Sequence, residues 1–133
     1  MNSENARRIL EAARAKAAEI GKPVSLAIVN AGGTLVALDR FNDPPSFTLQ
    51  VAEGKAVASA VMGMDSGRVA GLAQNLPAIT NALSARHPGR FVPLQGAVVV
   101  RDGSGVAGAI GVSGATSEED ETIAKAGAEA FRP

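Results

Sequence analysis

Few side chains in this sequence are suited to acid–base or nucleophilic chemistry. The chain has one histidine, His87, and no cysteine. Imidazole chemistry, whether general base, proton shuttle or haem ligand, must therefore use His87. The absence of cysteine excludes disulfides and thiolate sites, and it favours an intracellular, cytoplasmic protein. A Ser/His/Asp triad has little support, because a serine such as Ser46 or Ser113 needs an oriented base within reach.

An acidic run at residues 118–121 contains the other acid–base candidates, Asp120 and Glu121. A threonine–serine pair precedes the run and can cap a helix, so these carboxylates would lie in its first turn, where the helix dipole favours negative charge. No histidine lies nearby to complete a recognisable metal set. We therefore predict no metal site, and we keep His87, Asp120 and Glu121 as the candidate catalytic residues.

Residues 103–108 read GSGVAG, which matches the GxGxxG pattern of dinucleotide-binding loops. That fingerprint must follow a strand and open a helix, so that the helix N-terminus meets the pyrophosphate. Here the pattern opens a strand instead. We therefore interpret residues 102–105 as a hairpin turn.

The composition excludes several classes of partner. Thirteen basic and 13 acidic side chains give a formal net charge of zero, so no long-range field attracts nucleic acid or anionic lipid. Four Phe, with no Trp or Tyr, leave few platforms for base stacking. No segment approaches the length of a membrane span or resembles a signal peptide. We expect neither a nucleic-acid partner nor a membrane partner.

Apolar patterning predicts one α+β domain over residues 1–133. Three stretches have helical spacing: 3–20, 47–62 and 117–131. Alternating apolar residues predict two β-hairpins: 24–29 with 34–38, and 98–100 with 106–112. Shorter helical turns fill 65–86, interrupted at Pro77, and a short extra strand lies near 91–95. Ser3 is expected to cap the first helix, and Ser46 is expected to start the second.

Two long segments resemble a known family. Residues 24–41, VSLAIVNAGGTLVALDRF, resemble a hairpin of the GlcG/HbpS-like family (DUF336, the "haem-degrading" domain family), and the tripeptide 54–56 is similar to its DKA helix segment. Residues 106–121, VAGAIGVSGATSEEDE, resemble its VVGAIGVSGGTxEQDE signature. The likeness extends from the first helix to the last. It implies a profilin-like fold, an antiparallel sheet flanked by helices, and a homo-oligomer of two to eight subunits.

The resemblance also implies a small-molecule ligand, with haem or another tetrapyrrole as the candidate cofactor. We expect an apolar pocket between subunits, where glycines let a flat ligand approach the backbone. The candidate ligand-binding residues are Arg40, Lys55, Gln95, Gly96, Val112, Ser113 and Gly114.

The sequence departs from the family pattern at positions that bear on the ligand. Residues 95–98 read QGAV where GGIP or GGVP is common, Gly54 replaces an Asp, Ala115 replaces a Gly, and the first helix has no histidine. His87 and the three Met are the remaining axial donors for haem iron. These departures leave two alternatives open. One is a cofactor-free enzyme acting on a small organic acid or aromatic catabolite, and the other is a structural subunit with a decayed ligand site.

Overall fold

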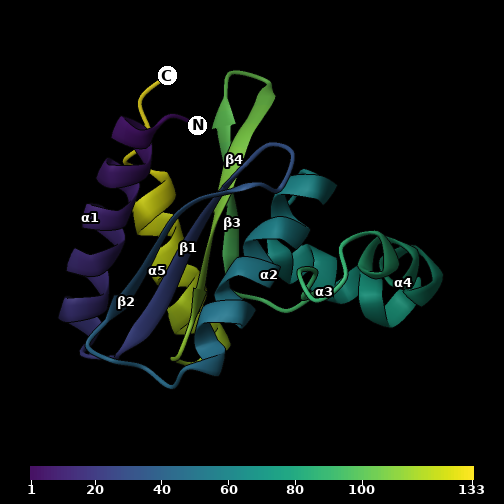
Figure 1. The fold of residues 1–133 in the computed structure, drawn as a ribbon, viewed down its shortest axis with the longest axis horizontal. Helices are drawn as coiled ribbons and strands as arrows, with labels where there is room; N and C mark the ends of the chain where they lie inside the picture. Colours follow the sequence, from purple (N-terminus) through teal and green to yellow (C-terminus); the bar gives the residue numbers. More distant parts are fainter.

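A four-stranded antiparallel sheet forms the centre of the computed structural model, which describes residues 1–133 (Figure 1). The strands are β1 (Val24–Asn30), β2 (Leu35–Phe41), β3 (Ala97–Asp102) and β4 (Gly105–Ser113). Their order across the sheet is β2-β1-β4-β3, so the two hairpins meet along β1 and β4. This arrangement confirms the predicted hairpins and the α+β class.

Helices cover both faces of the sheet. They are α1 (Ser3–Ile20), α2 (Phe47–Met62), α3 (Ser66–Asn75), α4 (Pro77–Arg86) and α5 (Ser117–Ala128). Helices α1 and α5 pack together on one face and α2 packs on the other, while α3 and α4 extend from the body as an arm (Figure 1). No helix is both long and apolar enough to cross a membrane.

Alternation along β1 explains why the sheet has a core on each face. Val24, Leu26 and Ile28 pack into the cluster shared with α1 and α5. Val29 points the other way and joins a smaller cluster with Ala56 and neighbouring residues of α2. All of the strand except Asn30 is therefore buried, and helices are required on both sides of it.

Helix α2 lies unusually close to β4 because Gly111 has no side chain. A Cβ atom there would overlap the carbonyl oxygen of Ala52 and lie 2.8 Å from the backbone nitrogen of Ala56. Both α2 residues are alanines and are fully buried. Small residues on both elements thus set the depth at which α2 sits on the sheet.

The predicted cap of the first helix is wrong, and the predicted start of the second is confirmed, since Ser46 is the N-cap residue of α2. Asn2, and not Ser3, caps α1, since its side chain accepts a hydrogen bond from Asn5 N at 2.9 Å. Ser46 has a helical backbone and makes no capping bond with its side chain. At α5, Thr116 forms the anticipated capping box with the residue three positions on.

The segment between α2 and β3 also differs from expectation. Pro77 separates two full helices of 10 residues each and begins the second, where its missing N–H is not needed. Residues 91–95 form no strand. Val92 N instead donates to Gly54 O at 3.0 Å, and Pro93 has no N–H to offer a sheet.

The close contact at Gly111 generates a stability prediction. Gly111→Ala should lower the free energy of unfolding by about 1–3 kcal/mol or more, because α2 must shift to admit the methyl group. Gly71→Ala is the control, since a Cβ there meets nothing within 4 Å in helix α3. Urea denaturation should show Gly71→Ala at or above wild-type stability. Equal stability of the two variants would contradict the close contact.

Candidate functional site

A buried ion pair joins three elements at one end of the sheet. Lys55 Nζ, on α2, lies 3.0 Å from Asp120 Oδ2, on α5, and the two side chains are 5% and 3% exposed. Lys55 Nζ also donates to Val112 O, near the end of β4, at 2.9 Å. The second carboxylate oxygen of Asp120 accepts from Ala115 N at 3.0 Å. This set of contacts fixes α2, β4 and α5 relative to one another.

Burial raises the pKa of Asp120 above its ordinary value, because the charged carboxylate loses water. The positive charge and hydrogen bond of Lys55, together with the backbone N–H of Ala115, offset part of this effect. The Asp120 carboxylate is thus held by Lys55 and by the backbone N–H of Ala115. Lys55 offsets the cost of removing this carboxylate from water.

Gly96 closes over this ion pair. Its φ angle is +130°, and a Cβ atom would lie 2.7 Å from Lys55 Nζ and 2.9 Å from Val112 O. Gly114 is similar, since a Cβ there would lie 2.5 Å from Pro23 O. Atoms of the same chain thus take the space where a side chain would lie at both glycines. Ligand contact by the two residues stays a prediction.

A surface pair lies directly beside the buried one. Gln95 Nε2 donates to Glu121 Oε2 at 2.5 Å. Gln95 directly precedes Gly96 in the chain, and Glu121 directly follows Asp120. Both side chains are partly exposed. The buried pair therefore places an amide and a carboxylate at the surface of the protein.

Glu121 lines two neighbouring pockets, which we together call the α3–α5 groove. One, of about 390 Å³, is lined by Met64, Asp65, Gly67, Arg68, Val99, Arg101 and Glu121. The other, of about 230 Å³, is lined by Gln95, Glu118, Glu121, Thr122 and Lys125. The groove thus carries three cationic side chains, three carboxylates, the Gln95 amide and a thioether.

Met64, Arg68 and Arg101 were not singled out from the sequence. Met64 lies in the link between α2 and α3, Arg68 in the first turn of α3 and Arg101 on the edge strand β3, so no local spacing connects all three. Arg101 is anchored, with Nη2 donating to Gly63 O at 2.7 Å. Asp65 Oδ1 accepts from Val99 N at 3.0 Å, which fixes the start of α3 against β3.

Of the seven predicted ligand-binding residues, Gln95 alone lines this groove. Arg40 is on β2 and binds Asp43 at 3.0 Å and Pro44 O at 2.5 Å. Ser113 is buried, and Gly114 is exposed at the end of the same strand. Arg40 and Ser113 lie in one row across the sheet, since both are paired with Ser25 of β1.

The candidate catalytic residues do not form one constellation. His87 follows α4 on the arm, where its ring stacks on Phe91 with centroids 6.3 Å apart and an interplanar angle of 21°. None of the four pockets is lined by His87 or by Asp120, whereas Glu121 lines two. The geometry therefore gives no support to a proton relay that combines the histidine with the two carboxylates.

The buried pair generates a second prediction. Lys55→Met should lower the free energy of unfolding by about 3–5 kcal/mol, because it leaves the Asp120 charge buried and unpaired. Lys125→Met, at an exposed position of α5, is the control and should change stability by about 0.5 kcal/mol or less. Urea denaturation at neutral pH measures both. A loss below about 1 kcal/mol for Lys55→Met would contradict the role of the ion pair.

The stability that Lys55→Met loses relative to wild type should also depend on pH. A carboxyl group whose pKa is raised in the folded state favours folding below its ordinary pKa, and this contribution is lost as the pH rises through the folded-state pKa. Without Lys55 the pKa of Asp120 should rise further. The difference in the free energy of unfolding between wild type and Lys55→Met should therefore shrink as the pH falls toward about 4. A deficit that grows on acidification would be the contrary result.

The fold and sequence have several known relatives. A 15.0 kDa protein of Citrobacter freundii, from the dhaT-dhaS intergenic region and described as uncharacterized, is 28% identical over 126 residues, covering 95% of this chain and 88% of that protein. HbpS has a solved structure with a TM-score of 0.89 and 25% identity, covering 100% of this chain and 91% of HbpS.

Two further solved structures share the fold. Klebsiella pneumoniae ORFY has a TM-score of 0.88 at 23% identity, covering 98% of this chain and 90% of that one. PduOC, solved as a complex with heme, has a TM-score of 0.86 at 23% identity, covering 99% of this chain and 95% of its own. The family model described as "Haem degrading protein HbpS-like" matches residues 1–129. The chain therefore belongs to the HbpS-like family, as the two sequence signatures indicated.

Proposed function

We propose that this protein binds a small ligand of the haem or tetrapyrrole class in the α3–α5 groove, as part of a homo-oligomer. Membership of the HbpS-like family supports the ligand class, and one protein of the same fold, PduOC, was solved with heme bound. The groove supports the location, because it has a thioether and two guanidinium groups in one pocket.

The observation that carries the proposal is the donor set of the larger pocket of the groove. Haem iron takes a His, Cys, Met or Tyr ligand, and the two propionates pair with cations. Met64 supplies a thioether, while Arg68 and Arg101 supply guanidinium groups in the same pocket. Val99 adds an apolar contact. The support thus comes from these donor groups, since only two of the seven residues that line this pocket are hydrophobic and two are carboxylates.

The residues named from the sequence take different parts in this proposal. Gln95 and Glu121 border the groove and would contact the ligand. Lys55, Gly96 and Val112 are buried and hold that border in place. Arg40, Ser113 and Gly114 lie elsewhere, so contact with a ligand would require a second site or a neighbouring subunit.

Acid–base catalysis receives less support from the geometry. Asp120 is 2% exposed and faces Lys55 rather than a pocket. His87 is the alternative haem ligand, but it lines no pocket of the chain. Ligand binding therefore fits the arrangement better than a cofactor-free reaction does.

Titration with haem tests the proposal. Wild-type protein should shift the Soret band with saturation, and Met64→Leu should weaken binding or change the spectrum, because the thioether donor is lost. His87→Ala is the matched variant and should titrate like wild type. Arg68→Gln and Arg101→Gln should each weaken binding severalfold through the propionates. Absence of a wild-type shift, or its loss in His87→Ala alone, would overturn the groove assignment.

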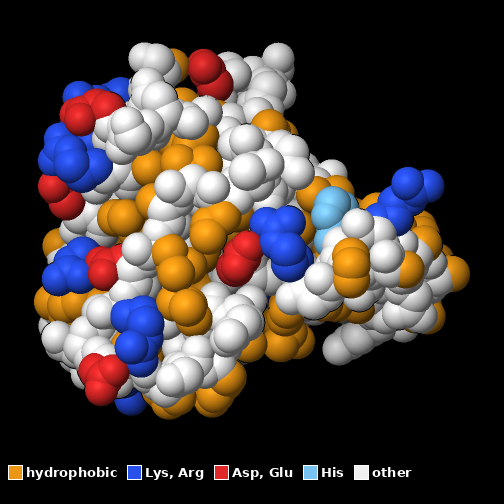
Figure 2. Space-filling model, viewed as in Figure 1, with side chains coloured by type: hydrophobic (Ala, Val, Ile, Leu, Met, Phe, Trp, Pro, Cys, Tyr) orange, Lys and Arg blue, Asp and Glu red, His pale blue; other side chains and the backbone are white.

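The arm formed by α3 and α4 supports the oligomeric part of the proposal. Helix α4 has 10 residues and a single buried side chain, Thr80, and isolated helices of this length are marginal in water. Leu76 and Ile79 are 51% and 46% exposed. Figure 2 shows hydrophobic side chains on the arm and on the adjoining face of the body.

A second copy of the chain is the occupant that we propose for these surfaces. The body has its own exposed apolar residues on β2 and at the start of α2: Leu35, Leu38 and Phe47. Packing the arm of one copy on the body of another would bury both patches. The zero net charge of the chain does not oppose such self-association.

Solution mass measures this arrangement. Wild type should sediment as a dimer or larger assembly at micromolar concentration, and the pair of substitutions Leu76→Asp and Ile79→Asp should shift it toward monomer, because charge is costly in a buried apolar contact. Asn81→Asp, at an exposed polar position of α4, is the control. A monomeric wild type, or an unchanged mass in the double variant, would refute the arm contact without bearing on the haem titration.

A further inference from the structure

The segment that connects α4 to β3, residues 90–96, is held along its length by α2. Arg90 Nε donates to Glu53 Oε1 at 2.9 Å, and Val92 N donates to Gly54 O at 3.0 Å. The last residue of the segment covers the ammonium group of the buried ion pair. Consecutive residues of one turn of α2 thus set the course of this 90–96 segment.

Gly54 provides a notch in α2 that receives the segment. The glycine is buried, and a Cβ atom on it would overlap Val92 Cγ2 and lie 2.9 Å from Val92 Cβ. The Val92 side chain therefore occupies the space that any other residue at position 54 would need. Because the side chain and the backbone N–H of Val92 both meet the same glycine, the segment is fixed there at two points.

The ion pair of Arg90 with Glu53 is a weaker attachment than this notch. Its two side chains are 40% and 23% exposed, and ion pairs that water reaches contribute little to stability. Arg90 also donates to Gly33 O at 2.7 Å, but this contact lies at the start of the segment. The contact at Gly54 is thus the one that holds the middle of the segment.

Val92 and Gln95 are joined by a short and stiff stretch of chain. Leu94 N donates to Val92 O at 2.9 Å, and the ring of Pro93 fixes the φ angle of that residue. A displacement of Val92 should therefore reach Gln95, whose side chain donates to Glu121 in the α3–α5 groove.

The bond between Gln95 and Glu121 matters to both pockets of the groove. Glu121 lines the two pockets, and Gln95 lines the smaller one. On the other side the pair packs against the start of α3, since a Cβ atom on Gly67 would lie 3.6 Å from Gln95 Cγ and 3.5 Å from Glu121 Oε2. Moving the Gln95 amide would therefore change the shape of the groove and release the Glu121 carboxylate.

We propose that Gly54 is a positioning residue for the α3–α5 groove. It lines neither pocket of the groove and acts through Val92, which sets where Gln95 meets Glu121. A side chain at position 54 would push the segment away from α2 and withdraw the Gln95 amide from the carboxylate. The effect on a ligand rests on the function proposed above, whereas the placement of Gln95 does not.

Gly54→Ala tests this role, since alanine suits the interior of a helix and adds a single methyl group. In two-dimensional NMR spectra of the full chain, the side-chain amide signals of Gln95 should shift toward those of a free amide. The Val92 N–H should exchange with solvent at least about tenfold faster than in wild type. Gly71→Ala is the matched control and should change neither, because a Cβ atom there meets nothing within 4 Å. Unchanged Gln95 signals in Gly54→Ala would overturn the proposal.

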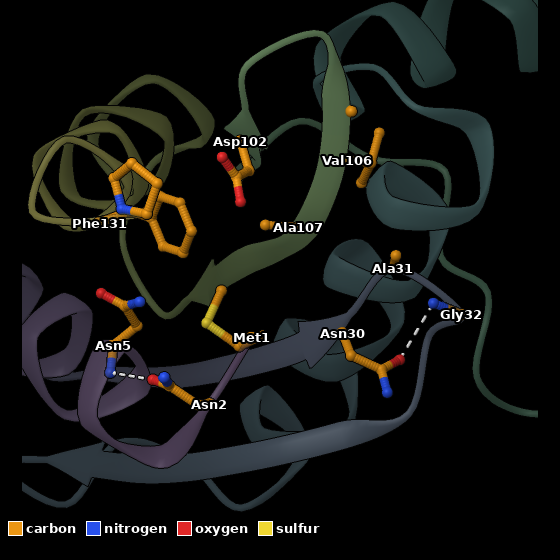
Figure 3. A pocket seen from close by; sticks show the side chains of 12 residues that line it. Met1, Asn2, Asn5, Asn30, Ala31, Gly32, Asp102, Val106, Ala107 and Phe131 are labelled. Atoms are coloured by element: carbon orange, nitrogen blue, oxygen red, sulfur yellow. Dashed lines mark hydrogen bonds between the residues drawn. The ribbon is translucent and has the colours of Figure 1, made fainter.

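A separate pocket at the opposite end of the sheet provides an internal control. It has a volume of about 670 Å³ and lies where the start of α1 meets the tips of both hairpins (Figure 3). None of the residues that line it belongs to the 90–96 segment, and Figure 3 shows the hydrogen bond from Asn5 N to the Asn2 side chain beside it. The Asn5 N–H signal should stay in place in Gly54→Ala. An equal change at Asn5 and Gln95 would contradict a local positioning role.

Substitution of Val92 tests whether the route from Gly54 to Gln95 is steric. With Val92→Gly added to Gly54→Ala, the new methyl group meets no side chain at position 92, and the nearest atom is the backbone nitrogen at 3.2 Å. The Gln95 signals should then return most of the way to wild type. Val92→Gly alone empties the notch without altering α2 and should also shift the Gln95 signals. A double variant that stays like Gly54→Ala, or unchanged signals in Val92→Gly, would refute the steric route.

Haem titration of the same variants separates this inference from the function proposed above. Haem affinity should fall severalfold in Gly54→Ala, stay at the wild-type level in Gly71→Ala and recover in the double variant. If wild-type protein does not bind haem, the proposed function fails, and the NMR signals of Gln95 still decide the role of Gly54. Wild-type haem affinity in a Gly54→Ala protein whose Gln95 signals have shifted would overturn the role of Gly54 in ligand binding.

Discussion

The buried contact between Lys55 and Asp120 is the constraint on which the rest of the candidate site depends. Two charges removed from water are costly unless each meets its opposite and its remaining hydrogen-bonding capacity is used. Here the ammonium group meets a carboxylate and Val112 O, and the carboxylate also accepts from a backbone N–H. Helix α5 can therefore occupy one position relative to α2, which fixes where Gln95 and Glu121 emerge at the surface.

Small residues make that contact geometrically possible. Lys55 can reach β4 because α2 lies close to the sheet, and α2 lies close because Gly111 faces Ala52 and Ala56. Gly96 then passes over the ammonium group with a backbone conformation that would be strained in any residue that has a side chain. These glycines and alanines thus allow the protein to bury a charged pair in close contact with the surrounding backbone.

Much of the fold could be predicted from the sequence because its signals are local. Both hairpins and the long helices follow from apolar spacing, and the family follows from two contiguous signatures. The burial of Lys55 was missed, because a lysine is usually solvated, although its spacing from Ala52 and Ser59 placed it on a buried face of α2. Asp120 was similarly explained by the helix dipole alone.

The groove could not be predicted for a different reason. Its residues come from the link after α2, from α3, from β3 and the segment before it, and from α5, and only the folded chain brings Met64, Arg68 and Arg101 to one pocket. The segment 91–95, which ends at the groove residue Gln95, was also expected to be a strand, whereas it hydrogen-bonds to α2 instead. Non-local sites of this kind depend on tertiary packing, which no periodicity in the sequence encodes.

A crystal structure of the protein soaked with haem addresses the central claim most directly. Our account places the iron beside the Met64 thioether, with the propionates on Arg68 and Arg101, above an intact contact between Lys55 and Asp120. Density for the iron beside His87, or haem seated away from the α3–α5 groove, would contradict it.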